Sequence, residues 1–155
     1  MNKVAFENAY YIKLGKNGIW EESSINENKL RIGWDGLSLD DINKGRWKKI
    51  EHILRQEITN KGAATRDLNA LKIICHSSEK DIWITFYSSK LWWCRVGKSE
   101  IYEDKTSKYR TISEGWFDKD IKGNILFINQ ISGKLSKTQG FRGTACQVDS
   151  RDVLK

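Results

Sequence analysis

The sequence predicts an α+β domain in which a small, curved, mostly antiparallel sheet of about five to six strands carries two main helices. Three observations lead to this fold class. Residues 9–14 and 29–34 alternate between apolar and polar side chains, as strands do. Residues 40–75 instead repeat their apolar positions at helical spacing. Residues 82–96 combine β-branched and aromatic residues around a short turn, which indicates a hairpin. A curved sheet of this size closes naturally into a small barrel.

The first strand, residues 9–14, ends at a turn that begins with Gly15. Gly15 and Gly18 both allow the positive φ that a tight turn requires. The second strand, residues 29–34, places its even-numbered apolar residues on one face. These two strands therefore each present one side to a core.

Two helices are predicted after these strands. Asp40 and Asp41 begin the first helix, because acidic residues in a first turn interact favourably with the helix dipole. Its apolar positions recur as far as Ile58, and Gly62 is expected to break the helical pattern. The second helix is predicted to begin at Thr65 and to bury one apolar face.

The clearest hairpin joins residues 82–87 to residues 91–96 through a three-residue turn. Trp92 and Trp93 are adjacent on its second strand, so they must point to opposite faces of the sheet. Further short strands are predicted at residues 100–102, 107–112 and 125–128.

The chain of 155 residues is expected to form one domain, residues 1–155, because its length suits a single hydrophobic core. Its composition, 39% hydrophobic and 30% charged, is typical of a globular domain. The longest apolar run, residues 82–87, is far too short to span a bilayer, and residues 1–7 do not resemble a secretory signal. We therefore expect a cytoplasmic protein with no membrane partner.

The three cysteines are widely spaced and form no C-x-x-C motif. Cys75, Cys94 and Cys146 are therefore predicted to be small buried hydrophobes and not metal ligands. The sequence also contains neither the P-loop pattern nor the dinucleotide-binding glycine pattern. These features predict a protein without a cofactor and without a metal.

The net charge of +7 predicts a polyanionic partner, of which nucleic acid is the commonest. The basic residues are spread along the chain, which favours a basic face on a folded domain over a basic tail. The side chains predicted to hold phosphates are Lys13, Lys16, Lys61, Arg66, Lys134, Lys137 and Arg142.

Seven tryptophans in one small domain are the strongest indication of a ligand. Most tryptophans fill cores, but Trp20, Trp34 and Trp116 each lie beside a turn residue or a charged residue. A pocket for an extruded base needs aromatic walls, a polar group that reads the base edge, and cations for the neighbouring phosphates. These three indoles are candidate walls, and the Ser23 hydroxyl is a candidate for reading the edge.

A small metal-dependent nuclease is the main enzymatic alternative. Such an enzyme needs two carboxylates that hold Mg²⁺ and a lysine that orients the attacking water. Asp81, Glu103 and Lys105 carry these groups. Asp118 and Asp120 form a second candidate pair of carboxylates. Neither pattern is specific in a chain this rich in charge, so the domain itself is predicted to be non-catalytic.

Several segments resemble a known family. Tyr10-Tyr11-Ile12-Lys13 followed by Gly18-Ile19-Trp20 resembles the opening of YTH domains, and residues 81–94 resemble the strand pair of that family. The wider group is the PUA-like superfamily, which includes EVE and ASCH domains. Within it, the chain looks most similar to the N-terminal reader domains of prokaryotic modification-dependent restriction systems, and residues 139–146 contribute to this likeness.

The resemblance implies a small barrel that binds modified or structured nucleic acid. It implies that Trp20 is the first wall of an aromatic cage, and that Trp116, or otherwise Tyr109, is the second. The chain departs from the family pattern after Trp20, because Glu21 and Glu22 precede the first serine. The departure concerns how a base edge is read.

Together, these observations predict a DNA-binding reader that accepts a flipped, methylated base in an aromatic pocket and directs a fused or partner nuclease to that site. An RNA-binding PUA-like module is a second interpretation, because nothing in the sequence separates DNA from RNA. The small metal-dependent nuclease is a third, and a protein-interaction domain of a defence complex is a fourth.

Overall fold

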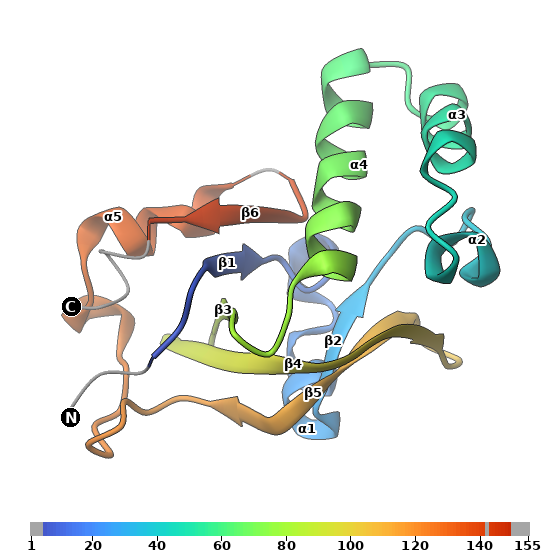
Figure 1. The fold of residues 1–155 in the computed structure, drawn as a ribbon. Helices are drawn as coiled ribbons and strands as arrows, with labels where there is room; N and C mark the ends of the chain where they lie inside the picture. The colour runs from blue at the N-terminus through green and yellow to red at the C-terminus, as the bar shows by residue number, and fades with distance from the viewer. Residues whose placement is uncertain (1–4, 142, 150–155) are drawn as a thin grey trace.

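The computed structural model describes residues 5–141 and 143–149. Its centre is a six-stranded sheet with the order β2-β5-β4-β3-β1-β6 (Figure 1). All neighbouring strands pair antiparallel except β1 and β3, which are parallel. The strands are β1 (Ala9–Ile12), β2 (Lys29–Ile32), β3 (Ile82–Tyr87), β4 (Lys90–Glu103), β5 (Lys108–Phe117) and β6 (Ala145–Val148). The α+β class and the mostly antiparallel sheet are thus as the sequence predicted.

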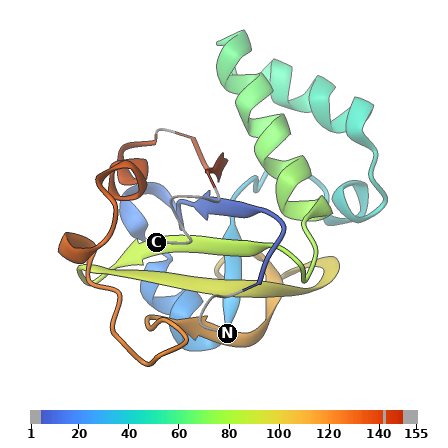
Figure 2. The ribbon, with the colours of Figure 1, turned by 60° about the vertical axis from the view of Figure 1, so that its left-hand side comes forward.

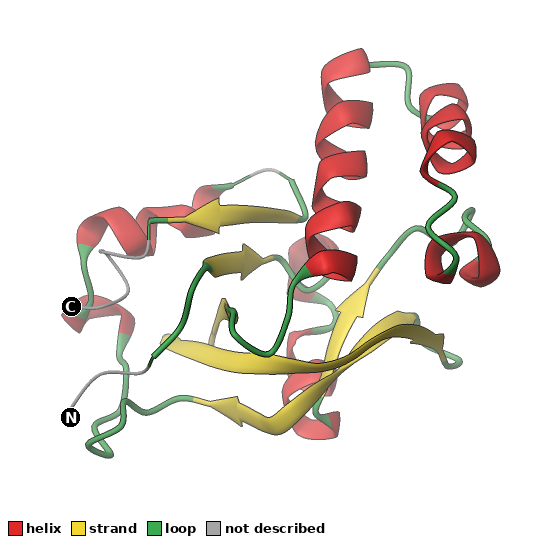
Figure 3. Ribbon diagram, viewed as in Figure 1, coloured by secondary structure: helices red, strands yellow, loops and turns green. Residues whose placement is uncertain are grey.

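The helices belong to the segments that connect the strands along the chain (Figure 3). The α-helices are α1 (Glu21–Glu27), α2 (Leu39–Asn43), α3 (Trp47–Glu57), α4 (Lys61–His76) and α5 (Gly133–Ser136). The 3₁₀ turns are η1 (Lys16–Gly18), η2 (Ile128–Gln130) and η3 (Lys137–Gly140). None of the helices in the described residues combines the length and apolar character that a membrane span requires.

Two helix boundaries differ from the prediction. The predicted first helix is divided into α2 and α3, because Gly45 adopts a φ of 65° between them. The second helix begins four residues before Thr65 and contains Gly62. Asn60 explains this start, because its side chain accepts a hydrogen bond from the backbone N–H of Ala63 at 3.1 Å and so caps the helix.

The strand pattern also differs in two places. The predicted strands at 91–96 and 100–102 are one long strand, β4, with a shift in its pairing to β5 between Val96 and Ile101. The predicted strand at 125–128 is replaced by isolated bridges, in which Ile125 pairs with Lys119. The edge strand β6 was not predicted, and it is held by antiparallel pairing with β1.

Each face of the sheet carries its own hydrophobic core. One core lies under the helices and contains Trp83, which packs against Tyr10 with ring centroids 5.0 Å apart. The other lies under the segment that includes α5, and contains the Tyr11 side chain. Trp92 packs against the first core and Trp93 against the second, which confirms that these neighbours face opposite sides.

The sheet is curved but open, and it does not close into the barrel that the sequence predicted, because the edge strands β2 and β6 do not pair with each other (Figure 1). The indole of Trp20 lies between the turn after β1 and the loop after β2. A Cβ on Gly15, after β1, would lie 3.0 Å from two ring carbons, and a Cβ on Gly33, after β2, would lie 3.9 Å from the far carbon Cη2. The end of β1 and the end of β2 therefore contact the same indole ring, although β5, β4 and β3 lie between these two strands in the sheet.

Helices α3 and α4 pair with each other and project from the sheet as an arm (Figure 2). The C-terminal end of α4 is anchored at the sheet, where the Ile74 carbonyl accepts a hydrogen bond from Arg110. The start of α4 at Lys61 is therefore about 20 Å further out, at a rise of ~1.5 Å per residue.

Candidate nucleic-acid interface

Trp20 lies on the turn that leads from β1 into α1. Its backbone N–H donates to the Leu14 carbonyl at 3.0 Å, and the Gly18 N–H donates to the Gly15 carbonyl at 3.1 Å. Gly15 and Gly18 have φ values of 83° and 70°, as the sequence predicted for this turn. Ile19, between Gly18 and Trp20, is 72% exposed. The turn therefore presents one large apolar side chain to solvent and a half-buried indole beside it.

The indole N–H groups separate the tryptophans into two classes. Five of the seven donate a hydrogen bond to a protein acceptor: Trp34, Trp83, Trp92, Trp93 and Trp116. Within the part of the chain that the structure describes, the N–H groups of Trp20 and Trp47 have no such acceptor. Neither nitrogen is among the buried polar atoms without a partner, so both N–H groups reach solvent and are free to donate to a ligand.

Trp116 is a core residue. It is only 8% exposed, and its Nε1 donates to the Lys29 carbonyl at 3.1 Å. The expectation that Trp116 forms an open pocket wall is therefore corrected, because β2 and the first core cover a ring that the sequence places beside a turn. Trp34 is half-buried, and its Nε1 donates to Asp67 Oδ2 at 3.1 Å, which ties the loop after β2 to α4.

Ser23 belongs to an ionic cluster at the β2 edge, and the Tyr109 ring lies against a lysine of this cluster. We define the Asp104 cluster as the side chains that surround the Asp104 carboxylate: Lys29, Arg31, Glu27, Ser23 and Ser107. Arg31, 1% exposed, donates to both oxygens of Asp104 at 2.9 Å and to Ser23 Oγ at 2.6 Å. Lys29 Nζ lies 4.4 Å from the centroid of the Tyr109 ring. Ser23 and Tyr109 thus already have partners within the protein.

Two of the predicted phosphate-binding lysines flank the Trp20 turn. Lys13 is half-exposed and Lys16 exposed, and neither forms an ion pair with an acidic side chain in the described residues. The backbone N–H of Lys13 donates to the Thr144 carbonyl at 2.8 Å. The segment that leads into β6 therefore lies beside the end of β1 and the Trp20 turn.

A second group of cations lies along the outer side of β6. A pocket of about 430 Å³ separates β6 from α5 and η3, and both Lys134 and Lys137 line it together with Phe141, Gln147 and one acidic residue, Asp149. Lys13 and Lys16 at one end of this strand, and Lys134 and Lys137 along it, make this edge of the sheet basic. We call this set of four lysines with Trp20 the β6-edge site.

The remaining predicted cations do not join the β6-edge site. Lys61 and Arg66 are exposed on the first part of α4, on the projecting arm. Arg142 lies outside the described residues.

Glu21 follows Trp20 directly, and the sequence did not mark it as a binding residue. It is the first residue of α1, it is half-buried, and a Cβ on Gly18 would lie 2.5 Å from its Cδ. Burial raises the pKa of the Glu21 carboxyl. Its carboxylate has no hydrogen-bond or ion-pair partner within residues 5–141 and 143–149. The only signal in the sequence was its position directly after Trp20.

The proposed nuclease residues are not assembled into a metal site. Asp81 is 5% exposed, and its carboxylate accepts from the Asn8 side chain at 3.0 Å and from the Ser78 N–H at 2.9 Å. Glu103 pairs with Lys108 at 3.2 Å, at the distal end of β4. No group of three or more metal-ligating side chains occurs within the described residues. Lys105 is exposed in the turn after β4.

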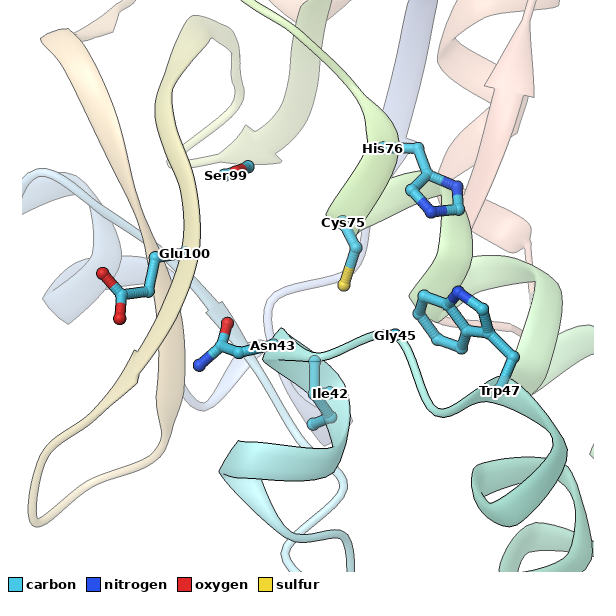
Figure 4. Close-up of a pocket in the computed structure, with 8 residues that line it drawn as sticks. All are labelled: Ile42, Asn43, Gly45, Trp47, Cys75, His76, Ser99 and Glu100. Atoms are coloured by element: carbon cyan, nitrogen blue, oxygen red, sulfur yellow. The ribbon is translucent and has the colours of Figure 1, made fainter.

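A pocket of about 390 Å³ lies between α2, α3, α4 and β4 (Figure 4). Trp47 and His76 form one wall, with ring centroids 5.5 Å apart, and the Cys75 sulfur points into the space (Figure 4). Burial raises the pKa of the Cys75 thiol to about 11, so this group stays protonated at neutral pH and is a poor nucleophile.

The polar walls of the same pocket serve the fold. The Asn43 side chain donates to the Ile101 carbonyl at 2.9 Å and accepts from the Ile101 N–H at 2.7 Å, which joins α2 to β4. Glu100 accepts a hydrogen bond from the Tyr102 hydroxyl at 2.9 Å. The side chains of Asn43 and Glu100 are therefore engaged within the fold, whereas the Trp47 N–H has no protein acceptor in the described residues.

Comparison with known proteins finds no matching family model, no matching curated protein and no matching solved structure. The resemblance to PUA-like readers stays a prediction, and a functional proposal must depend on the geometry of the site.

Proposed function

We propose that this domain binds DNA along the β6-edge site and stacks a flipped, methylated base on the indole of Trp20. The observation that carries the proposal is that Trp20 is half-buried, keeps a free N–H within the described part of the chain, and lies near two lysines without acidic partners there. An aromatic surface beside unpaired cations is the arrangement that single-stranded and extruded nucleotides require.

The expected energies are consistent with such a site. One stack of a base on an aromatic ring contributes about 1–3 kcal/mol, and extrusion of the base costs a few kcal/mol. Because Trp116 is covered, the stack on Trp20 cannot offset extrusion alone. Phosphate contacts from Lys13, Lys16, Lys134 and Lys137 supply the rest, and a methyl group on the base adds about 0.8 kcal/mol if it is buried.

Cleavage of the bound DNA is assigned to a fused or partner nuclease. The engaged carboxylates of Asp81 and Glu103 favour a role for this domain in recognition and not in catalysis.

A titration with fluorescently labelled duplexes tests the proposal. Methylated, unmethylated and abasic duplexes of one sequence are compared over a range of salt concentrations. Wild-type protein should prefer the methylated duplex, and Trp20→Ala should remove this preference. Trp47→Ala is the matched control, because its N–H also has no acceptor in the described residues but its ring lies in the pocket beside α4. Equal affinity for all three duplexes would exclude a base-binding site.

The lysines are tested in the same assay. Lys16→Ala combined with Lys137→Ala should weaken binding to all duplexes and lower the slope of log K against log salt by about 0.9 for each lost contact. Lys48→Ala combined with Lys98→Ala removes the same charge elsewhere and should change the slope less. Competition with RNA of the same sequence decides between DNA and RNA as the ligand. If the protein binds RNA more tightly, its ligand is RNA and not DNA.

A further inference from the structure

The pocket of about 390 Å³ between the helical arm and the sheet is a binding site in its own right (Figure 4). Its lining residues come from α2, from the start of α3, from the end of α4 and from the middle of β4. Its volume lies within the range of about 300–1,000 Å³ that is typical of small-molecule sites. None of the four lysines of the β6-edge site lines it, and neither does Trp20.

The rings of Trp47 and His76 form an aromatic corner in this pocket. Their planes meet at 78°, so a flat ligand that stacks on one ring meets the edge of the other. The Trp47 N–H has no acceptor within the described residues and still reaches solvent. A Cβ on Gly45 would lie 3.4 Å from Trp47 Nε1, so a side chain at that position would crowd the N–H. The corner therefore combines a stacking surface with one accessible donor.

No permanently charged side chain faces the pocket within the described residues. Its lining contains no lysine, arginine or aspartate. Glu100 borders it, but the Glu100 carboxylate lies on the side of β4 away from Cys75 and accepts from the Tyr102 hydroxyl (Figure 4). Because burial raises the pKa of the Cys75 thiol to about 11, the sulfur is also uncharged at neutral pH. A phosphate or carboxylate would thus be desolvated here without a cation, which favours an uncharged ligand.

The polar groups of the pocket are few and come from opposite sides. The helices supply the Trp47 N–H and the His76 imidazole, and β4 supplies the Ser99 hydroxyl, which forms no side-chain hydrogen bond in the described residues. Ile42 and Cys75 add apolar surface. A sugar would leave most of its hydroxyls without partners in such a site, whereas a planar heterocycle needs only two or three.

We infer that this pocket binds an uncharged nitrogen heterocycle of the size of a nucleobase or nucleoside, stacked in the corner of Trp47 and His76 with a ring acceptor on the Trp47 N–H. The inference goes beyond the proposed function and does not depend on it. A nucleotide of DNA carries phosphates, for which this pocket has no cation, so the ligand here is a free small molecule.

Isothermal titration calorimetry with adenine, adenosine and AMP tests the inference. Adenine and adenosine should bind, and AMP should bind about tenfold more weakly, because its phosphate loses hydration without gaining a cation. Cytosine and cytidine extend the test to the smaller ring. If none of these five compounds bound at concentrations up to about 1 mM, the inference would be wrong.

Two variants locate the ligand in this pocket. Trp47→Phe keeps a ring for stacking but removes the donor, and should weaken adenosine binding about fivefold. Trp93→Phe is its control, because the Trp93 N–H already donates to the Lys119 carbonyl and the ring packs on the other core. It should bind adenosine as the wild type does.

Cys75→Met extends a side chain into the space toward which the Cys75 sulfur points, and should reduce adenosine binding at least about tenfold (Figure 4). Cys146→Met makes the same substitution at the half-buried cysteine of β6 and should leave adenosine binding unchanged. Thermal melting of each variant shows whether it is folded.

The outcomes that contradict the inference differ from those that contradict the proposed function. Wild-type affinity for adenosine in folded Trp47→Phe and Cys75→Met proteins would place the ligand elsewhere. AMP binding as tight as adenosine binding would show that the pocket accepts a phosphate-bearing ligand. Neither result concerns Trp20, whose role is decided by the titrations with duplexes.

Discussion

Arg110 Nη1 donates a hydrogen bond to the Ile74 carbonyl oxygen at 2.7 Å, and this contact joins the last turn of α4 to β5. The same guanidinium also donates to the carbonyls of Ser77, Gly97 and Lys98. Arg110 is 2% exposed and forms no ion pair with a carboxylate in the described residues. Its charge is stabilised by carbonyl dipoles at a helix C-terminus, while burial lowers its pKa. One side chain thus anchors the helical arm to the sheet.

Arg110→Lys should destabilise the domain by about 3–5 kcal/mol, because an ammonium group cannot reach carbonyls on several sides and leaves some of them buried without a donor. Urea denaturation followed by tryptophan fluorescence measures the change. Arg95→Lys is a suitable control, since Arg95 is more exposed and also donates to backbone carbonyls. Equal effects of the two substitutions would contradict the anchoring role.

Asp104 should make stability depend on pH in the acid range. The hydrogen bonds from Arg31 and then Lys29 hold the pKa of Asp104 well below its ordinary value of about 3.9. A depressed pKa means that the folded state binds the proton less readily than the unfolded state. The stabilisation is therefore complete above about pH 4 and is lost as the pH falls toward the folded-state pKa.

Asp104→Asn should cost roughly 1–3 kcal/mol at pH 7, since the nearly buried Arg31 loses its carboxylate but keeps Ser23 and Ser107 as partners. Below about pH 4 the difference between variant and wild type should shrink, because Asp104 of the wild type then binds a proton in the unfolded state while it stays ionised in the folded state. Chemical denaturation at a series of pH values measures this difference. A difference that is constant from pH 7 to pH 2 would contradict it, and Glu22→Gln serves as the control for an exposed charge.

The buried positions of three cationic side chains could not be predicted from the sequence. Arg31, Lys108 and Arg110 are at most 2% exposed, although a chain of net charge +7 suggests that its basic residues lie on the surface. Each is buried because partners from distant segments surround it, as when Arg31 meets Asp104 from 73 residues away. Periodicity reports which face of an element is apolar, but it contains no information about such pairings.

The sequence predicted correctly those features that depend only on neighbouring residues. The hairpin of β3 and β4, the glycine turn before Trp20 and the opposite orientation of Trp92 and Trp93 depend on a few adjacent residues, and the sequence predicted them. The hairpin turn itself is one residue shorter than predicted, because Lys90 pairs with Tyr87 and leaves only Ser88 and Ser89 between the strands. Trp116 looked accessible because its neighbours are turn residues, yet β2 covers it. For the candidate sites, the lysines near Trp20 were predicted, whereas the pocket beside Trp47 was not, because its lining residues come from distant segments of the chain.

Ser24→Ala should leave stability unchanged or raise it by up to about 1 kcal/mol. Ser24 is fully buried and its hydroxyl is the one buried side-chain polar atom without a partner in the described residues. Removal of an unsatisfied hydroxyl relieves a desolvation cost, and alanine is also the better helix former. Thermal denaturation measures the change. Ser23→Ala is the matched comparison and should destabilise by about 1–3 kcal/mol, because it deprives Arg31 Nε of its acceptor.

Gly15→Ala should both destabilise the domain and impair binding. Gly15 has a φ of 83° and a ψ of 163°, a region that essentially only glycine adopts, so alanine there costs about 1–3 kcal/mol. Its Cβ would lie 2.6 Å from Ile19 Cγ2 and 3.0 Å from the Trp20 ring. Displacement of these side chains adds a further 1–3 kcal/mol or so. Gly123→Ala measures the backbone cost of alanine at a positive φ without a steric clash, because Gly123 has a φ of 88° and nothing lies within 4 Å of the new Cβ. Gly140→Ala, at an open position without positive φ, should change little.

The same variants separate a general loss of stability from a defect at the site. Gly15→Ala should reduce the preference for methylated duplex as Trp20→Ala does, because the indole that receives the base is displaced. Gly123→Ala should lose stability but keep the preference, when both are measured at a temperature well below their melting points. If Gly15→Ala retained the wild-type preference for methylated duplex, the position of this indole would not determine binding.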